Sequence, residues 1–267
     1  MSGMKRTVSC HLELSVAGPA ELVLGIAVAG GVPLAAETLA ITAAGQPATA
    51  SELPDAHGTR LHRLQVGAGA VVVDYSAEVD GLAEPPEVTP VDRLRYLRQS
   101  RYCEADSLAP TAAAEFAGGA GIELLQAVVA WVHERIAYVS GSSTGTDSAL
   151  DTLLARQGVC RDFAHLSIAL LRALGVPARL AAVYAPGLSP MEFHAVCEAL
   201  VDGAWWVVDA TQLAPRQSLL RVATGRDAAD TAFLTSFGAA VTLDAIEVTA
   251  VADDFALDDQ ATLTQLR

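Results

Sequence analysis

Gly158-Val159-Cys160-Arg161-Asp162-Phe163 marks the point at which a polar loop turns into a long apolar helix. The helix is expected to begin at or near Cys160 and to continue to Leu174. Gly175 is suited to the C-terminal cap, and Pro177 prevents continuation. The free N–H groups and the positive dipole end of a helix N-terminus favour the thiolate form of a cysteine. This stretch therefore predicts a reactive thiol at Cys160.

A β-hairpin is predicted further along the chain. Residues 194–201 and 204–209 read as strands, and residues 178–184 as another strand before them. Between the first two stands Asp202-Gly203, a strong signal for a two-residue turn. If this turn forms, Val201 pairs with Ala204, which sets the register of the whole hairpin.

His194 and Asp209 share one face of the predicted hairpin, because strand side chains alternate and Asp209 faces Val196 in this register. Diagonal neighbours of this kind lie about 7–8 Å apart at the backbone, so the two side chains can meet. A carboxylate in that position can fix the tautomer of an imidazole and stabilise the imidazolium. Cys197 lies on the opposite face and is expected in the core. Together with Cys160, these two residues form a candidate catalytic Cys-His-Asp triad.

The predicted triad is suited to acyl transfer. An imidazole beside a helix-terminal thiol yields a thiolate–imidazolium pair, which attacks carbonyl groups. The backbone N–H of Cys160 and a second, unidentified donor would stabilise the oxyanion. Two alternatives remain open at this point. Asp209 could cap a turn at Ala210-Thr211 instead of orienting His194, and His165, which lies off the helical face of Cys160, is interpreted as structural or supporting.

The first third of the chain is predicted to be all β. In residues 8–16 every second residue is apolar, Cys10 among them, and residues 21–29, 61–66 and 70–79 are also strand-like. We expect a small antiparallel sandwich over residues 1–81. The Pro-rich stretch 82–91 is expected to be a linker. Residues 92–267, with helices that include 122–138 followed by strands, are expected to form an α+β core.

Composition excludes several classes of protein. The chain has 267 residues, 52% of them hydrophobic, and a net charge of -14 that argues against binding nucleic acid or an anionic membrane. We expect no signal peptide and no membrane span. The four scattered cysteines indicate neither a disulfide framework nor a metal site, so a cytoplasmic protein without a cofactor is expected. The acidic tail from Asp253-Asp254 to Asp258-Asp259 is expected to be solvated. The oligomeric state stays open.

Three segments resemble the transglutaminase-like superfamily, a branch of the papain-like thiol enzymes. They are residues 158–165, residues 192–195 and residues 205–211. In such proteins the catalytic order is Cys, His, Asp, which matches Cys160, His194 and Asp209. The resemblance spans about residues 92–255 and is weaker over the β-rich N-terminal part. It implies a papain-like α+β core preceded by a small β-sandwich domain. The calcium sites of the animal enzymes have no recognisable counterpart here, so no metal is inferred.

Two function hypotheses follow. The first is a cysteine-dependent acyl-transfer enzyme that acts on peptide or glutamine amide bonds through a thioester intermediate. Depending on whether an amine or water receives the acyl group, it would be a transglutaminase-like acyltransferase or a cysteine protease or amidase, with a protein or peptide as its substrate. The second is a non-catalytic interaction module that retains the same fold. Selective reaction of Cys160 at low pH would separate the two.

Overall fold

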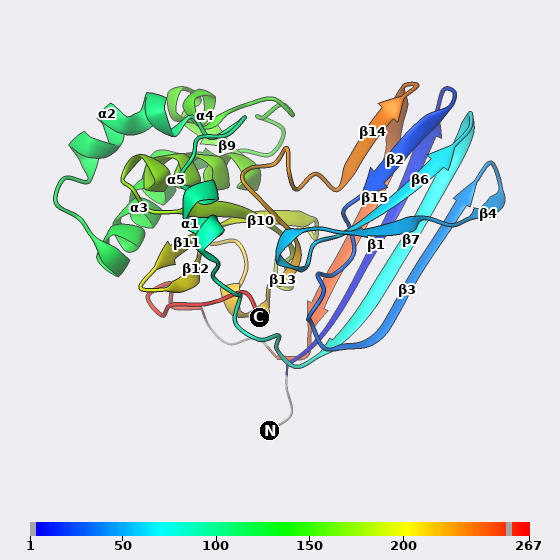
Figure 1. The fold of residues 1–267 in the computed structure, drawn as a ribbon, viewed down its shortest axis with the longest axis horizontal. Coiled ribbons are helices and arrows are strands. Elements are labelled where there is room, and N and C mark those ends of the chain that lie inside the picture. Colours follow the sequence, from blue (N-terminus) through cyan, green and yellow to red (C-terminus); the bar gives the residue numbers. More distant parts are fainter. Residues whose placement is uncertain (1–3, 255–257) are drawn as a thin grey trace.

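The computed structural model describes residues 4–254 and 258–267 and has two lobes (Figure 1). One lobe is a β-sandwich, and the other carries helices on an antiparallel sheet. The predicted α+β fold class, with a sheet-rich N-terminal part, is confirmed. Within the described residues, no helix has the length and apolar character needed to cross a membrane.

The sandwich consists of a five-stranded sheet in the order β15-β1-β7-β3-β4 and a four-stranded sheet in the order β14-β2-β6-β5. Alternate residues of β1, including Val8, Cys10 and Leu12, are fully or almost fully buried and pack with Leu22 and Leu64 of the other sheet. The predicted inward row of β1 is thus confirmed. The strand bounds are β1 (Lys5–Val16), β2 (Ala20–Leu24), β3 (Leu34–Ala43), β4 (Gln46–Ala48), β5 (Ser51–Pro54), β6 (Arg60–Val66), β7 (Gly69–Asp80), β14 (Leu234–Gly238) and β15 (Val241–Ala252).

Two strands from the end of the chain complete this sandwich. β15 pairs antiparallel with β1 along almost its whole length, from Arg6 opposite Ala252 to Val16 opposite Val241. β14 pairs in the same way with β2, and Figure 1 shows both orange strands among the blue and cyan ones. The predicted division into a sandwich of residues 1–81 and a core of residues 92–267 therefore needs correction. Pairing between strands this far apart leaves no local signal in the sequence.

The strand predicted over residues 21–29 is shorter than expected, because β2 ends at Leu24. Residues 26–29 are still buried, but their backbone turns towards the other lobe. Ala29, for example, donates its N–H to the carbonyl of Arg221 at 2.8 Å. The apolar run therefore marks the contact between the lobes as well as a strand.

Residues 82–89 have no regular secondary structure and connect β7 to the first helix. That helix begins at Pro90, so it includes the last two residues of the predicted linker. The second lobe is built around α5, which packs against α2, α3 and α4 on one side and against β10 and β11 on the other. Its sheet has the order β12-β11-β10-β13. The bounds are α1 (Pro90–Tyr96), α2 (Ala105–Glu115), α3 (Gly121–Arg135), β8 (Ala137–Tyr138), α4 (Ala149–Ala155), β9 (Gln157–Gly158), α5 (Cys160–Ala173), β10 (Ala178–Tyr184), β11 (Phe193–Val201), β12 (Ala204–Val208) and β13 (Leu220–Gly225), with short 3-10 turns at Ala56–Gly58 and Arg216–Ser218.

The predicted start of α5 is confirmed, and its end lies one residue before the predicted Leu174. The helix begins at Cys160 and ends where Gly175 adopts a φ of +78°, a conformation that glycine tolerates best. Gly175 donates its N–H to the carbonyl of Arg172, and Val176 donates to that of Leu171, which closes the end of the helix. Within α5, residues 162–172 are buried, and Cys160 at its start is partly exposed.

The two lobes meet across buried charged groups. Glu198 accepts hydrogen bonds from Arg179 at 2.8 Å and from Arg221 at 2.7 Å. Burial raises the pKa of Glu198, but the two guanidinium groups outweigh it and lower that pKa to about 2. Arg179 also donates to Nδ1 of His57 in the sandwich at 3.1 Å, and His57 Nε2 lies 3.2 Å from Asp92. These contacts hold the lobes in one relative position.

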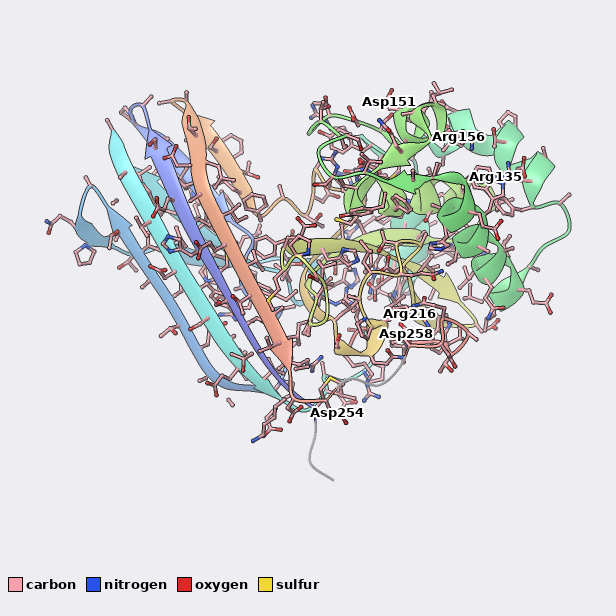
Figure 2. All side chains as sticks on the ribbon, turned by 180° about the vertical axis from the view of Figure 1, so that it is seen from behind. Arg135, Asp151, Arg156, Arg216, Asp254 and Asp258 are labelled. Atoms are coloured by element: carbon pink, nitrogen blue, oxygen red, sulfur yellow. The ribbon has the colours of Figure 1, made fainter. Side chains whose placement is uncertain are left out.

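The end of the chain is also held against the second lobe. The guanidinium of Arg216 lies 2.7 and 2.8 Å from the two carboxylate oxygens of Asp258, and Figure 2 shows the two residues side by side. Thr264 accepts the backbone N–H of Val207, and Leu266 is buried. The expectation that this acidic end is solvated is therefore wrong for Asp258, whose side chain is 6% exposed.

Candidate active site

Cys160 occupies the first position of α5 and is the one partly exposed cysteine; the other three are buried. The turn before it is closed by Asp162, whose carboxylate accepts the N–H of Val159 at 2.8 Å. Gly158 makes this turn possible, because a Cβ there would lie only 2.7 Å from the Cβ of Asp162. The missing side chain of Gly158 and the carboxylate of Asp162 therefore position the thiol at the helix N-terminus, where the dipole favours a negative charge.

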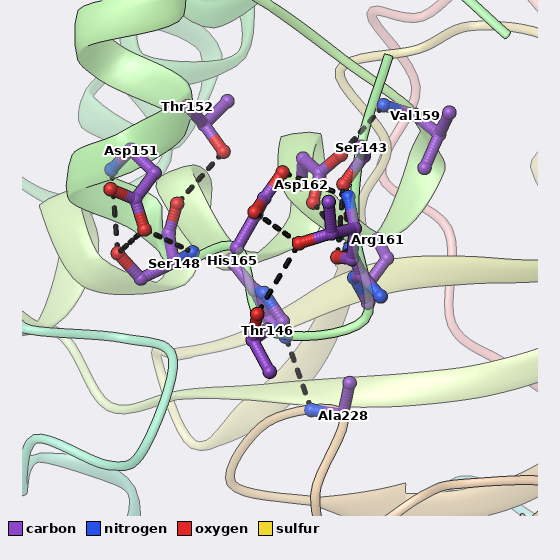
Figure 3. A network of polar contacts seen from close by, with 12 residues as sticks. Ser143, Thr146, Ser148, Asp151, Thr152, Val159, Arg161, Asp162, His165 and Ala228 are labelled. Atoms are coloured by element: carbon purple, nitrogen blue, oxygen red, sulfur yellow. Dashed lines mark hydrogen bonds and ion pairs between the residues drawn. The ribbon is translucent and has the colours of Figure 1, made fainter. Parts of the chain in front are cut away.

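Arg161 ties a neighbouring loop to the start of α5. Its Nη2 donates to Ser143 Oγ at 2.6 Å and to the carbonyl of Thr144, and it lies 3.1 Å from Asp162 Oδ1 (Figure 3). The next helix, α4, begins with a capping box between Ser148 and Asp151 that the same figure shows. The loop of residues 140–147 is thus held beside the nucleophile.

β11 and β12 form the predicted hairpin, and its register is confirmed. Val201 lies opposite Ala204, and the turn residues Asp202 and Gly203 have φ values of 51° and 77°, as a tight hairpin turn requires. Cys197 is fully buried against the helices. His194 therefore lies on the opposite face of the hairpin from Cys197, as the alternation of strand side chains predicts.

His194 and Asp209 meet on this hairpin. Nε2 of His194 donates to Oδ2 of Asp209 at 3.0 Å, and both side chains are 1% exposed. The second carboxylate oxygen, Oδ1, accepts the backbone N–H of Thr211 at 2.9 Å and its hydroxyl at 2.7 Å. Asp209 thus orients the imidazole and closes the turn at Thr211, so the two alternatives for this residue are compatible.

The environment of His194 favours the imidazolium. Burial lowers the pKa of His194, but the charge of Asp209, its hydrogen bond and the thiol of Cys160 together raise that pKa to about 10. Burial raises the pKa of Asp209, yet the imidazolium and the Thr211 hydrogen bonds leave it below its usual value. Nδ1 of His194 has no hydrogen-bond partner within residues 4–254 and 258–267. Because Asp209 occupies Nε2, Nδ1 is the nitrogen left for the thiol of Cys160.

Two other histidines support the surroundings of the site. Nε2 of His165 accepts the N–H of Ala228 at 3.1 Å (Figure 3), and its ring stacks on Tyr102. Burial lowers the pKa of His165 to about 3, so the ring is neutral, in agreement with a structural role. Nδ1 of His133 bonds to the carbonyl of Ala210 at 2.9 Å, directly after Asp209.

Tyr138 is the neighbour of Cys160 that sequence reasoning missed. The segment 122–138 reads as one helix, but α3 ends at Arg135 and Ala137–Tyr138 forms a short parallel pair with Gln157–Gly158. This pairing brings Tyr138 close to the start of α5. A contact between segments 20 residues apart, made by a two-residue strand, has no pattern by which a sequence could reveal it.

Two other places in the described residues carry candidate groups. On the sandwich, Cys10 and His11 of β1 lie beside Asp74, but burial raises the pKa of Cys10 to about 12 and so disfavours its thiolate. A cavity of about 710 Å³ lies at the junction of the lobes, lined by residues that include His57, Asp92 and Arg221, but by none of the three triad residues. No three His, Cys, Asp or Glu side chains in the described ranges gather into a group suited to a metal ion. Since acyl transfer needs a nucleophile beside a base, we place the candidate active site at Cys160 rather than in this cavity.

The sequence and the fold of this chain are similar to those of known proteins. Residues 110–210 match the sequence model of a family described as the transglutaminase-like superfamily. The crystal structure of a "Putative Cysteine Protease" from Cytophaga hutchinsonii is similar over 96% of this chain and 93% of that chain, with 33% identity and a TM-score of 0.86.

Two curated relatives are uncharacterised. A Mycobacterium leprae protein is 34% identical over 122 residues, which are 40% of this chain and 42% of that protein. A Mycobacterium tuberculosis protein is 44% identical over 66 residues, 25% of this chain and 20% of that protein. The matched stretches span less than half of either relative.

Proposed function

Because the chain belongs to the transglutaminase-like superfamily, we propose that it is a cysteine-dependent enzyme that cleaves amide bonds of proteins or peptides. The observation that carries this proposal is the buried His194–Asp209 pair, 3.0 Å apart, which leaves the second imidazole nitrogen available to the partly exposed thiol of Cys160. A thiol, an imidazole and a carboxylate in this order are the groups that nucleophilic acyl transfer needs.

The first half of the reaction forms a thioester. The thiolate of Cys160 attacks the carbonyl carbon, and the π electron pair of the carbonyl moves onto its oxygen. When this tetrahedral species collapses, the C–N bond breaks and the imidazolium of His194 gives its proton to the departing amine. Asp209 keeps the imidazole oriented and stabilises its charge before that transfer.

The second half transfers the acyl group to an acceptor. Neutral His194 takes a proton from water or from an amine, which attacks the thioester and releases Cys160 as a thiolate. The C. hutchinsonii relative, 33% identical, carries the name "Putative Cysteine Protease", and this favours water as the acceptor. Transfer to an amine, as in transglutamination, is the second candidate because it uses the same thioester. The proposed setting is the cytoplasm, where the thiols stay reduced.

Two parallel assays test this proposal. The purified chain is incubated with casein, to follow peptide release, and with a glutamine peptide plus a fluorescent amine, to follow cross-linking. We expect casein hydrolysis that the Cys160→Ala variant lacks and that the Cys103→Ala variant, altered at a buried cysteine, retains. Activity that persists in Cys160→Ala would refute the mechanism. Absence of both activities, with no thioester detectable by mass spectrometry, would favour the non-catalytic module.

A further inference from the structure

We propose that the hydroxyl of Tyr138 is the second hydrogen-bond donor to the oxyanion that forms when Cys160 attacks a carbonyl group. The inference rests on the proposed function, and it identifies the donor that sequence patterns leave unassigned. The first donor is the backbone N–H of Cys160 at the start of α5. Two donors aimed at the developing charge form the usual arrangement for acyl transfer.

The backbone places Tyr138 beside the nucleophile. Tyr138 lies opposite Gly158 in the parallel pair of β8 and β9, and Gly158 stands two positions before Cys160. Val139 then donates its N–H to the carbonyl of Gly158 at 3.0 Å, which extends the pairing. The segment that carries Tyr138 is therefore joined directly to the turn that presents the thiol.

The side chain of Tyr138 is directed to the same place. Its ring lies against that of Phe163 in the first turn of α5, with 5.9 Å between the ring centres. Its hydroxyl lies 3.4 Å from Oε1 of Glu192, a long hydrogen bond at the exposed end of the hairpin. The side chain therefore extends from the first turn of α5 towards Glu192, two residues before His194. A carbonyl attacked by Cys160 would be bound in this region.

The surroundings of Tyr138 favour the protonated form of its hydroxyl. Burial raises the pKa of Tyr138 most, and the negative charges of Cys160 and Glu192 raise it further. The backbone of Cys160 acts in the opposite direction and lowers this pKa. The hydroxyl therefore keeps a proton to donate at neutral pH.

The bound substrate changes the partners of this hydroxyl. In the tetrahedral species the sulfur–carbon bond has formed, and the former π pair resides on the carbonyl oxygen. That oxygen accepts hydrogen bonds from the Cys160 N–H and the Tyr138 O–H, while neither proton is transferred. Tyr138 exchanges its long bond to Glu192 for a shorter, charge-assisted one to the oxyanion. When the leaving group departs, the carbonyl forms again and the hydroxyl returns to Glu192.

Two reactions of the same thiol separate this role from a structural one. Acylation by p-nitrophenyl acetate forms an oxyanion and expels p-nitrophenolate. Alkylation by iodoacetamide forms a sulfur–carbon bond with loss of iodide and has no oxyanion. In Tyr138→Phe we expect acylation to slow about 10²-fold while alkylation changes by less than about twofold. Tyr102→Phe, which keeps the ring that stacks on His165, is the matched control and should leave both rates unchanged.

Each result has one meaning. Acylation that is as fast in Tyr138→Phe as in the wild type overturns the inference and leaves the proposed function standing. Faster acylation also overturns it and shows that the hydroxyl blocks the oxyanion site. Loss of both reactions in Tyr138→Phe indicates that the residue holds the helix start in place rather than donating to the oxyanion. If the unmodified protein shows neither reaction at Cys160, the proposed function fails and this inference fails with it.

Discussion

Nε2 of His194 lies 3.0 Å from Oδ2 of Asp209, across a hairpin and 15 residues along the chain. Both side chains are almost completely buried, and their pKa values are shifted in opposite directions, upward for the imidazole and downward for the carboxyl group. A buried pair of this kind is costly when one partner is lost, because an isolated charge then remains in the interior. The predictions for activity and for stability both depend on this pair.

Asp209→Asn should reduce kcat by about 10² to 10⁴-fold, because the amide neither stabilises the imidazolium nor fixes its tautomer. Thr211→Val removes the hydroxyl that donates to Oδ1 at 2.7 Å and leaves the carboxylate in place. We expect a smaller loss for this variant, about tenfold or less. Steady-state kinetics with one peptide substrate checks the order. An Asp209→Asn enzyme as active as the wild type would contradict the orienting role.

Stability should fall as the pH rises above neutrality. Folding raises the pKa of His194 from 6.5 to about 10, so the folded protein binds this proton more tightly than the unfolded chain does. The stabilisation is fully present below pH 6.5 and is lost as the pH rises through about 10. A tenfold difference in proton affinity between the folded and unfolded chain is equivalent to about 1.4 kcal/mol of unfolding free energy. Urea unfolding near pH 6.5 and near pH 10 measures the change.

The Asp209→Asn variant is the control for that measurement. Without the carboxylate, the largest influence that raises the pKa of His194 is absent, so the decline in unfolding free energy between the two pH values should shrink. Groups that titrate equally in both proteins cancel in the comparison. The same decline in wild type and variant would show that His194 is not the group responsible.

Cys160 should react selectively with iodoacetamide in the native protein. Burial raises the pKa of Cys10 to about 12, and it also raises the pKa values of Cys103 and Cys197. Cys160 is partly exposed at a helix N-terminus, where thiolates are favoured. Peptide mapping should find one label at neutral pH and four after unfolding. Equal labelling rates for Cys160 and Cys103 in the native protein would contradict the assignment of the nucleophile.

Gly158→Ala should destabilise the protein and slow acylation. The added Cβ would lie 2.7 Å from the Cβ of Asp162 and 2.9 Å from its Oδ2, which displaces the carboxylate from the N–H of Val159. We expect a loss of roughly 1–3 kcal/mol in unfolding free energy. Gly145→Ala is the matched control, because a Cβ at that position has no heavy atom within 4 Å. Equal effects of the two substitutions would argue against the close packing of this turn.

A fragment of residues 92–267 should not fold on its own. It lacks β1 and β2, the partners of β15 and β14, so two strands would present unpaired edges and the buried side chains of Val248 and Ala250. Circular dichroism should show no cooperative thermal transition, in contrast to the full chain. A cooperative transition together with selective alkylation of Cys160 would show that the second lobe is an independent domain.

Features that depend on neighbouring residues were predictable. The helical spacing of apolar residues after Gly158-Val159-Cys160 and the glycine suited to a C-terminal cap, Gly175, predicted the position of α5. Both signals are local, because the backbone hydrogen bonds of a helix join residues four apart. Asp202-Gly203 located the hairpin turn, and the alternation of strands then put His194 and Asp209 on one face. These are short-range rules, and the register that follows from them agrees with the structure.

Long-range pairing was not predictable from the same patterns. Nothing within β15 identifies β1 as its partner, because any strand of suitable alternation could occupy that edge, and the predicted domain boundary was wrong for this reason. The position of Tyr138 depends equally on the pairing of β8 with β9. The local sequence specified a nucleophile, a base and its orienting carboxylate. The packing of distant segments decided which surfaces meet and which hydroxyl lies beside Cys160. The hydrogen bonds and the buried area that select this arrangement exist only after the chain has folded.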